Sequence, residues 1–95
     1  MPTFDAELWL HDGEAAWCFV TLPADLSDDI ADRADGSRRG FGAVRVRVTV
    51  GSTSWATSIF PDTKRGAYLL PVKKDVRRRE GLEVGDLLRV ALELA

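Results

Sequence analysis

Seven residues near the middle of the chain, VRVRVTV at 44–50, alternate between valine and a polar side chain. Because successive side chains of a β-strand point to opposite faces, this pattern places four valines on one face and Arg45, Arg47 and a threonine on the other. A glycine and a serine follow, which favour a turn, and the run TSWATSIF at 53–60 returns. The centre of the chain is therefore predicted to be a β-hairpin with one buried face.

Similar strand patterns recur along the chain and predict an all-β fold. Further strands are expected at 4–10, 17–22, 67–72 and 87–94. A hairpin turn is expected at 11–13, and strands do not alternate with helices in the manner of a parallel sheet. Antiparallel strands must protect the edges of their sheet, and closure into a small barrel does so. We therefore predict a single domain over 1–95, a small closed six-stranded β-barrel.

One or two short helices are expected beside the barrel. The acidic stretch PADLSDDIADRADGS at 23–37 fits a short helix or an irregular loop, because Leu26 and Ile30 lie four residues apart. The stretch 73–80 fits a second helix, which Gly81 would end in the left-handed conformation. Neither segment is long enough to change the predicted all-β class.

The second predicted helix contains the densest charge in the chain, with two lysines and three arginines between 73 and 79. The arginines fall in its last turn, where the helix dipole favours cations and a structural role explains them. Lys73 and Lys74 stand at its start, where the dipole opposes them. Two interpretations stay open: a solvated helix face, or an anion site at Lys73 and Lys74 for phosphate, sulfate or a nucleic-acid backbone.

Four arginines extend the anion-binding hypothesis beyond the two lysines. Arg77 and Arg78 belong to the same helix, and Arg45 and Arg47 point outward from their strand. Guanidinium groups stack on flat rings and bind phosphate through paired hydrogen bonds. The alternative for the two strand arginines is cross-strand pairing with an acid such as Asp5 or Glu7.

The sequence contains no recognisable catalytic constellation. His11, the only histidine, lies in a predicted turn, and Cys18, the only cysteine, lies in a predicted strand and is expected to be buried. One histidine and one cysteine cannot provide a usual zinc spacing. The carboxylates between 25 and 32 are expected on a solvated face, a weak divalent-cation site among them being the alternative. We therefore expect no enzyme activity, no metal site and no cofactor.

Trp9 and Tyr68 are the candidate contacts for a ligand or protein partner. Trp9 lies on the polar side of its predicted strand and is expected to be the most exposed of the three tryptophans, most of which should belong to the core. An exposed tryptophan is an effective anchor for a partner. Tyr68 or Trp9 is expected near an apolar or mixed pocket at one mouth of the barrel.

The net charge of −2 is unevenly distributed along the chain. The first 36 residues hold nine acids and one arginine, whereas the rest hold six acids and twelve basic residues. This asymmetry indicates an anion-seeking half or two halves that neutralise each other in the fold. The sequence MPTFDAELWL lacks the features of a signal peptide, and no apolar run approaches the roughly 20 residues of a membrane span. A cytoplasmic monomer or homodimer without membrane contact is expected.

Four stretches of the chain resemble, in order and over nearly its whole length, the prokaryotic DUF1905 family of unknown function. They are FDAELW, WCFVTLP, GAVRVRVTVGSTSWATSIFPD and GAYLLPVKKDVRRREGLEVGDLLRVALEL. The resemblance implies a closed six-stranded barrel of the double-split type. It implies no activity, cofactor or site.

A second resemblance covers the C-terminal third alone. The stretch LPVKKDVRRREGLEVGDLLRVAL is similar to the swapped-hairpin element of AbrB-type transition regulators and MazE-type antitoxins. Those proteins are usually dimers and often bind DNA, which would extend here to Lys73, Lys74 and the arginines of 77–79. We therefore expect a non-catalytic binding or accessory module of unknown ligand, with DNA or RNA binding through 73–79 as the alternative.

Overall fold

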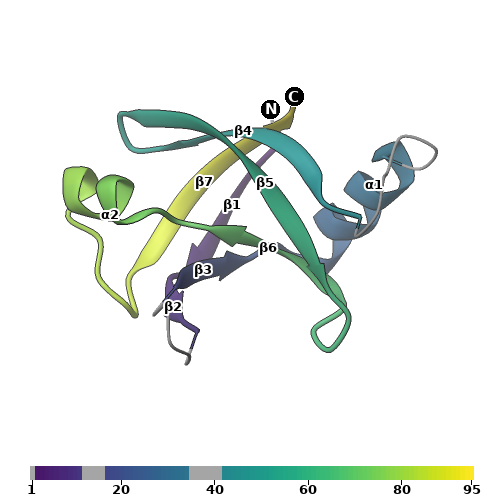
Figure 1. Cartoon of the computed structure of the whole chain (residues 1–95), viewed down its shortest axis with the longest axis horizontal. Helices are drawn as coiled ribbons and strands as arrows, with labels where there is room; N and C mark the ends of the chain where they lie inside the picture. The colour runs from purple at the N-terminus through teal and green to yellow at the C-terminus, as the bar shows by residue number, and fades with distance from the viewer. Residues whose placement is uncertain (1, 12–16, 35–41) are drawn as a thin grey trace.

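The computed structural model describes residues 2–11, 17–34 and 42–95, which form a nearly closed antiparallel barrel with two short helices (Figure 1). Its strands are β1 (Thr3–Glu7), β2 (Trp9–Leu10), β3 (Cys18–Thr21), β4 (Val44–Val50), β5 (Thr53–Asp62), β6 (Ala67–Pro71) and β7 (Leu87–Leu94). Its helices are α1 (Ala24–Ala34) and α2 (Lys74–Glu80). The strands follow one another around the barrel in the order β1-β7-β4-β5-β6-β3-β2.

The alternation of β4 builds the core as the sequence predicts. All four of its valines are buried, while Arg45 and Arg47 are exposed. The neighbouring strands β5 and β7 supply Ile59, Leu88 and Leu92 to the same interior, and β3 and β6 close it from the opposite side. The all-β class is therefore confirmed.

The strand count differs from the prediction, because the segment 4–10 forms two strands and not one. Leu8 interrupts it: its N–H donates to the carbonyl of Asp86 (2.9 Å) and its carbonyl accepts from the N–H of Gly85 (2.8 Å). Before Leu8 the chain pairs with β7, and after it with β3. The barrel therefore has seven strands, and its double-split type stays a prediction.

The helices lie at opposite ends of the barrel (Figure 1). In α1 the Oγ of buried Ser27 accepts a hydrogen bond from the N–H of Tyr68 (3.0 Å), which ties the helix to β6. The Arg33 guanidinium pairs with Asp29 one turn earlier (3.0 Å). The acidic stretch is thus a helix, and neither described helix has the length and apolar character needed to cross a membrane.

Helix α2 confirms the predicted cap, since Gly81 adopts φ 65° and its N–H bonds the carbonyl of Arg77. Glu80 fastens the helix to the turn between β4 and β5: its carboxylate accepts the hydroxyls of Thr53 (2.6 Å) and Ser52 (3.2 Å). The Thr53 hydroxyl holds the pKa of Glu80 below its ordinary value, and Ser52 adds to this. Glycine suits position 51, because its φ is 59° and an added Cβ would lie 2.0 Å from the Glu80 carboxylate, which would have to move away.

The end of β5 and one predicted turn need separate comment. The strand predicted at 53–60 extends further than its pattern indicates, because Pro61 and Asp62 still pair with β6. A proline is tolerated there because β4 pairs with β5 only as far as Ile59, so Pro61 has a neighbouring strand on one side alone. The predicted turn at 11–13 falls largely outside the described residues.

Candidate functional site

The outer surface of β2, β3 and β6 carries aromatic side chains in register with one another. Trp9 of β2 lies opposite Phe19 of β3. The N–H of His11 donates to the carbonyl of Trp17 (2.7 Å), which continues the same register by one more pair. Residues that face each other across an antiparallel pair point to the same side of the sheet. Four rings therefore stand together on the outside of the barrel.

The distances between ring centroids make Phe19 the centre of this group. Trp9 lies 5.4 Å from it at 35°, and His11 lies 6.1 Å away, edge-on at 84°. Trp17 lies 6.3 Å from Phe19 with its plane turned by only 17°. These separations fall in the range at which aromatic pairs attract each other. The rings consequently hold one another in place.

Lys73 lies beside this group of rings, next to Trp17. Phe19 lies opposite Pro71, and the N–H of Val72 donates to the carbonyl of Cys18 (3.0 Å), so the register of β3 with β6 continues past the end of the strand. Lys73 follows with an extended backbone, φ −63° and ψ 153°. The register therefore places Lys73 opposite Trp17, on the same outer side.

A further ring extends the array toward β5. Phe60 lies opposite Leu69, which lies opposite Thr21. Phe60 is 44% exposed and Trp17 is 54% exposed. We call this surface the aromatic face and define it by Trp9, His11, Trp17, Phe19 and Phe60.

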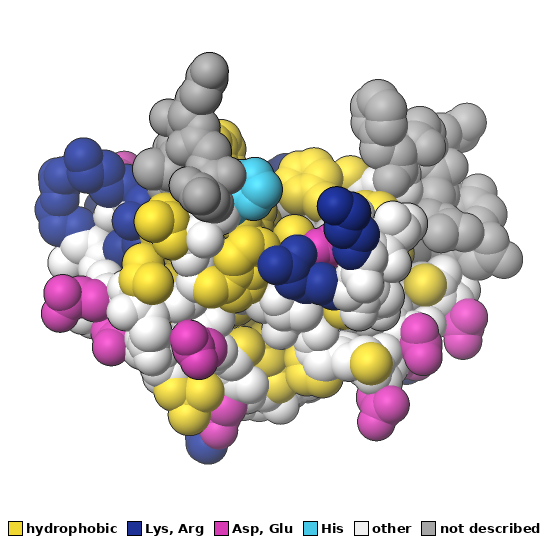
Figure 2. Space-filling model, turned by 90° about the horizontal axis from the view of Figure 1, so that it is seen from below, with side chains coloured by type: hydrophobic (Ala, Val, Ile, Leu, Met, Phe, Trp, Pro, Cys, Tyr) yellow, Lys and Arg dark blue, Asp and Glu magenta, His cyan; other side chains and the backbone are white. Residues whose placement is uncertain are grey.

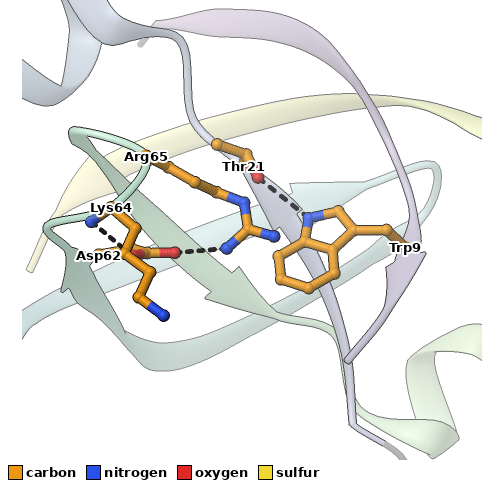
Figure 3. Close-up of polar contacts among 5 residues, drawn as sticks. All are labelled: Trp9, Thr21, Asp62, Lys64 and Arg65. Atoms are coloured by element: carbon orange, nitrogen blue, oxygen red, sulfur yellow. Dashed lines mark hydrogen bonds and ion pairs between the residues drawn. The ribbon is translucent and has the colours of Figure 1, made fainter. Parts of the chain in front are cut away.

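The hairpin between β5 and β6 places a second cationic group on the aromatic face (Figure 3). The guanidinium of Arg65 lies 4.3 Å from the centroid of the Trp9 ring. It also donates to the carboxylate of Asp62 (2.5 Å), which accepts the N–H of Lys64 as well (3.0 Å). On the other side, the indole N–H of Trp9 donates to the hydroxyl of Thr21 (3.0 Å). Arg65 and Trp9 are therefore both fixed by neighbours.

The hydrogen bond between Arg65 and Asp62 also favours the ionised form of the Asp62 carboxyl group. The hydrogen bond from Arg65 lowers the pKa of Asp62 from its ordinary value of 3.8, and the Lys64 N–H adds to the effect. The carboxylate consequently stays ionised and keeps the guanidinium against the ring. Arg65 was not predicted as a site residue, and the spacing of Asp62 and Arg65 was its only sequence signal.

The structure exchanges the predicted roles of two tryptophans. Trp9 was expected to be the most exposed, but it is half-buried beneath Arg65. Trp17 was expected to belong to the core with most of the tryptophans, but only Cys18, Val20 and Leu22 of its segment are buried. Trp17 therefore stands in solvent, and the predicted burial of Cys18 is confirmed.

Tyr68, the other predicted contact, lies apart from the rings. It is 4% exposed and lines a recess of about 210 Å³ between α1 and the β5–β6 hairpin, together with Ser27 and Asp62. A second recess, about 260 Å³, lies between α1 and the end of β7 beside the Asp29–Arg33 pair. Neither recess includes Trp17 or Phe19 in its lining.

The six cations of the anion-binding hypothesis separate into two groups. Lys73, Lys74, Arg77 and Arg78 belong to α2 and the residue before it, and this segment starts where Lys73 lies opposite Trp17. The Nε of Arg77 donates to the carbonyl of Val72 (3.2 Å). Figure 2 shows hydrophobic side chains around the histidine, with one group of Lys and Arg side chains at the left edge and another to the right of the histidine, near the middle of the surface. The acidic side chains lie mainly toward its edges.

Arg45 and Arg47 belong to a different face, the outer side of β4. Arg45 donates to the Ser58 hydroxyl (3.3 Å), and Arg47 lies opposite Glu93 of β7. The alternative pairing with Asp5 or Glu7 is wrong, because β1 is not adjacent to β4 in the sheet. Asp5 pairs with Arg89 of β7 instead (3.0 Å), and that hydrogen bond lowers its pKa.

Within residues 2–11, 17–34 and 42–95, no group of three His, Cys, Asp or Glu side chains is arranged to hold a metal ion. A family model described as domain of unknown function (DUF1905) matches residues 4–92. No curated protein matches the chain.

Proposed function

The chain belongs to the DUF1905 family, whose description assigns no activity, and from its surface geometry we propose a non-catalytic binding module that holds its ligand on the aromatic face. Trp17 is the observation that carries this proposal. Trp17 is 54% exposed although it directly precedes β3, whose Cys18 and Val20 are buried in the core. Apolar surface left in water costs about 25 cal/mol per Å², and a contiguous patch of it indicates a contact site.

The aromatic face is also preorganised, which lowers the entropic cost of binding. Phe19 packs against three other rings, and Trp9 is held between the Thr21 hydroxyl and the Arg65 guanidinium. Side chains that are already ordered lose little freedom when a ligand covers them. Tryptophan and arginine are also the residue types that dominate the energy of binding surfaces.

We place this module in the cytoplasm of a prokaryotic cell, as a monomer or homodimer. Cys18, the only cysteine, is buried and unpaired, which suits a reducing compartment. The two recesses beside α1 are of secondary interest, since each is smaller than the roughly 300 Å³ typical of small-molecule sites.

DNA or RNA binding through 73–79, in the manner of AbrB-type proteins, is the second candidate. The observation that favours it is the exposure of Lys73, Lys74, Arg78 and Arg79, none of which pairs with a carboxylate among the described residues. In this alternative the helix contacts the phosphate backbone and the rings contribute nothing. In that case, reversing the charge of these lysines and arginines would abolish binding, whereas Trp17→Ala would leave binding unchanged.

The test is a map of amide chemical-shift changes by nuclear magnetic resonance with four probes: a mixed-sequence single-stranded oligonucleotide, its duplex, an acidic peptide and a basic peptide. At least one probe is expected to shift amides of β2, β3 and the end of β6, because these strands carry the rings. The expected shifts disappear in Trp17→Ala.

Leu94→Ala is the matched control, because Leu94 is an exposed apolar side chain (38%) at the far end of β7. It should leave the shifts unchanged. The proposal fails if no probe perturbs β2 and β3, or if every perturbation lies on α2 or β4 and persists in Trp17→Ala.

A further inference from the structure

Resting on the proposed function, we infer that the ligand of the aromatic face is a single-stranded nucleic acid. Its bases stack on the exposed rings, and its phosphates lie against the cations at the two ends of the face. The evidence is the coincidence, on one surface, of two nearly parallel rings, of which Trp17 is widely exposed, and two separated groups of cations. The first group, Lys73 and Lys74, has no carboxylate partner among the described residues, and the second, Lys64 and Arg65, is exposed although Arg65 also bonds Asp62.

The rings suit unpaired bases. Trp17 and Phe19 lie two residues apart on one outer face, with planes within 17° of each other and centroids 6.3 Å apart. Trp17 exposes 54% of its side chain, so a flat ring has access to it. Aromatic side chains accept any base as a stacking partner, because every base has a π-face. Duplexes bury these faces within their own stack, which is why a single strand fits this surface better.

The charges suit phosphates at both ends. Lys73 lies opposite Trp17 and Lys74 follows it at the start of α2, whereas Lys64 and Arg65 lie on the hairpin at the other end. The carboxylate nearest to the second group, Asp62, is already bonded to Arg65. Figure 2 shows this distribution, with basic side chains on both sides of the hydrophobic area. A polymer of flat bases joined by phosphates matches that order of chemistry along the face.

The length of the face sets the size of the site. From the hairpin at Gly66 to Lys73 the chain runs along β6 for about 20 Å, at roughly 3.3 Å per residue of strand. That span accommodates a few nucleotides, at the low end of the roughly 4–16 nucleotides that single-strand sites cover on small barrels. The outer face of the Arg65 guanidinium, whose inner face lies on Trp9, is a second stacking platform.

The experiment is fluorescence anisotropy of a labelled oligothymidine about 12 nucleotides long and of the matching duplex, at ~50 and ~200 mM salt. The single strand is expected to bind more tightly than the duplex. Trp17→Ala should weaken single-strand binding by about 5- to 100-fold, the range for loss of one stacked base. Lys73→Glu/Lys74→Glu should weaken it as well, and should reduce the slope of log affinity against log salt by about 1 or more.

Arg45→Glu/Arg47→Glu is the matched control, because it makes the same change in net charge on the outer face of β4. It should change the affinity by less than about threefold at the higher salt, where long-range charge effects are screened. Circular dichroism and urea unfolding of every variant establish that the barrel is intact.

The other possible results distinguish failure of this inference from failure of the proposed function. If the oligonucleotide fails to bind but a peptide shifts β2 and β3 in the resonance map, the inference is wrong and the proposed function stands. If the duplex binds as tightly as the single strand and Trp17→Ala has no effect, the inference is wrong and the second candidate gains. If no probe of either kind reaches the aromatic face, both the inference and the proposed function fail.

Discussion

The barrel has two outer faces of opposite character on one shared core. On the β4–β5–β7 side, most outward side chains are polar and several are partnered: Arg45 bonds Ser58, Thr49 bonds Ser54, and Arg89 pairs with Asp5. Leu87 and Leu94, near the two ends of β7, are exposed large apolar side chains of this side. On the β2–β3–β6 side, rings stand outward and remain partly open. The inner faces of both sides contribute buried apolar side chains to one core cluster.

The difference between the two outer faces distinguishes features that the barrel requires for folding from features that it does not require. A barrel of this size requires an apolar interior, which both sides supply, and an exterior that water solvates well, which the polar side supplies apart from Leu87 and Leu94. Neither packing nor solubility requires Trp17 to stand in solvent next to Lys73. The aromatic face is therefore the region in which the chain departs from the demands of its fold, and departures of this kind mark functional surfaces.

The two tryptophans Trp55 and Trp17 provide the largest expected contrast. Trp55 of β5 is partly buried and packs against the core, so Trp55→Ala is expected to lower the free energy of unfolding by about 2–3 kcal/mol. Trp17→Ala removes the same side chain from an exposed position and is expected to cost less than about 1 kcal/mol. Urea unfolding of both variants measures the difference, and similar losses would place Trp17 among the structural residues.

Trp55→Phe sharpens the same comparison. The indole N–H of Trp55 is buried and finds no hydrogen-bond partner in the described part of the chain. An unsatisfied buried donor costs about 1–3 kcal/mol, which offsets part of the packing lost with the smaller ring. Trp55→Phe is therefore expected to retain most of the stability that Trp55→Ala loses.

Gly51→Ala tests the polar side at its turn, with a smaller effect. Gly51 has φ 59°, which a residue with a Cβ adopts at a cost of about 1 kcal/mol or more. The added Cβ would also displace the Glu80 carboxylate from Thr53 and Ser52. We expect a loss of about 1–3 kcal/mol in urea unfolding, with single-strand affinity unchanged when α2 remains in place.

Gly81→Ala is the control for this variant. Gly81 has a similar φ of 65°, but nothing lies within 4 Å of an added Cβ. It should therefore show the backbone cost alone and a smaller loss than Gly51→Ala. Equal losses would contradict the role assigned to Glu80.

The smallest expected effect is the pH dependence of the two faces. Asp62 on the aromatic side and Asp5 on the polar side both have pKa values lowered by an arginine, from an ordinary value of 3.8. A lowered pKa stabilises the folded state above the unfolded pKa, and this stabilisation is lost as the pH falls through the folded value. Stability should therefore decline below about pH 4.

Nuclear magnetic resonance distinguishes the two carboxylates during that titration. Protonation of Asp62 weakens its bond to Arg65, so the indole signals of Trp9 should shift with the Asp62 midpoint. Protonation of Asp5 should leave Trp9 unchanged, because its partner Arg89 lies on β7. A Trp9 signal that stays constant through the Asp62 titration would contradict the contact in Figure 3.

The sequence predicts those parts of the fold that depend on local patterns. The valine alternation of β4, the glycine cap of α2 and the terminal strand are confirmed because each depends on neighbours within one segment. The break at Leu8 was missed since the residues on both sides keep the same alternation. Only the hydrogen bonds to Gly85 and Asp86, more than 70 residues away, reveal it.

The aromatic face depends on information that a single segment does not contain. Trp9 and Lys73 were each singled out, but in separate hypotheses, and only the register of β2, β3 and β6 places them on one surface. Trp17 was assigned to the core because its strand is apolar on both faces, and apolar residues alone do not indicate which face meets solvent. Phe60 and Arg65 could be assigned to this face only once the pairing of β5 with β6 was known.

The most direct test of the account is one variant measured in two ways: the affinity of Trp17→Ala for the labelled single strand, and its free energy of unfolding in urea. The account predicts that affinity falls at least about fivefold while the free energy of unfolding changes by less than about 1 kcal/mol. Unchanged affinity in a variant of unchanged stability would contradict it, because the most exposed ring of the aromatic face would then contribute to neither folding nor binding.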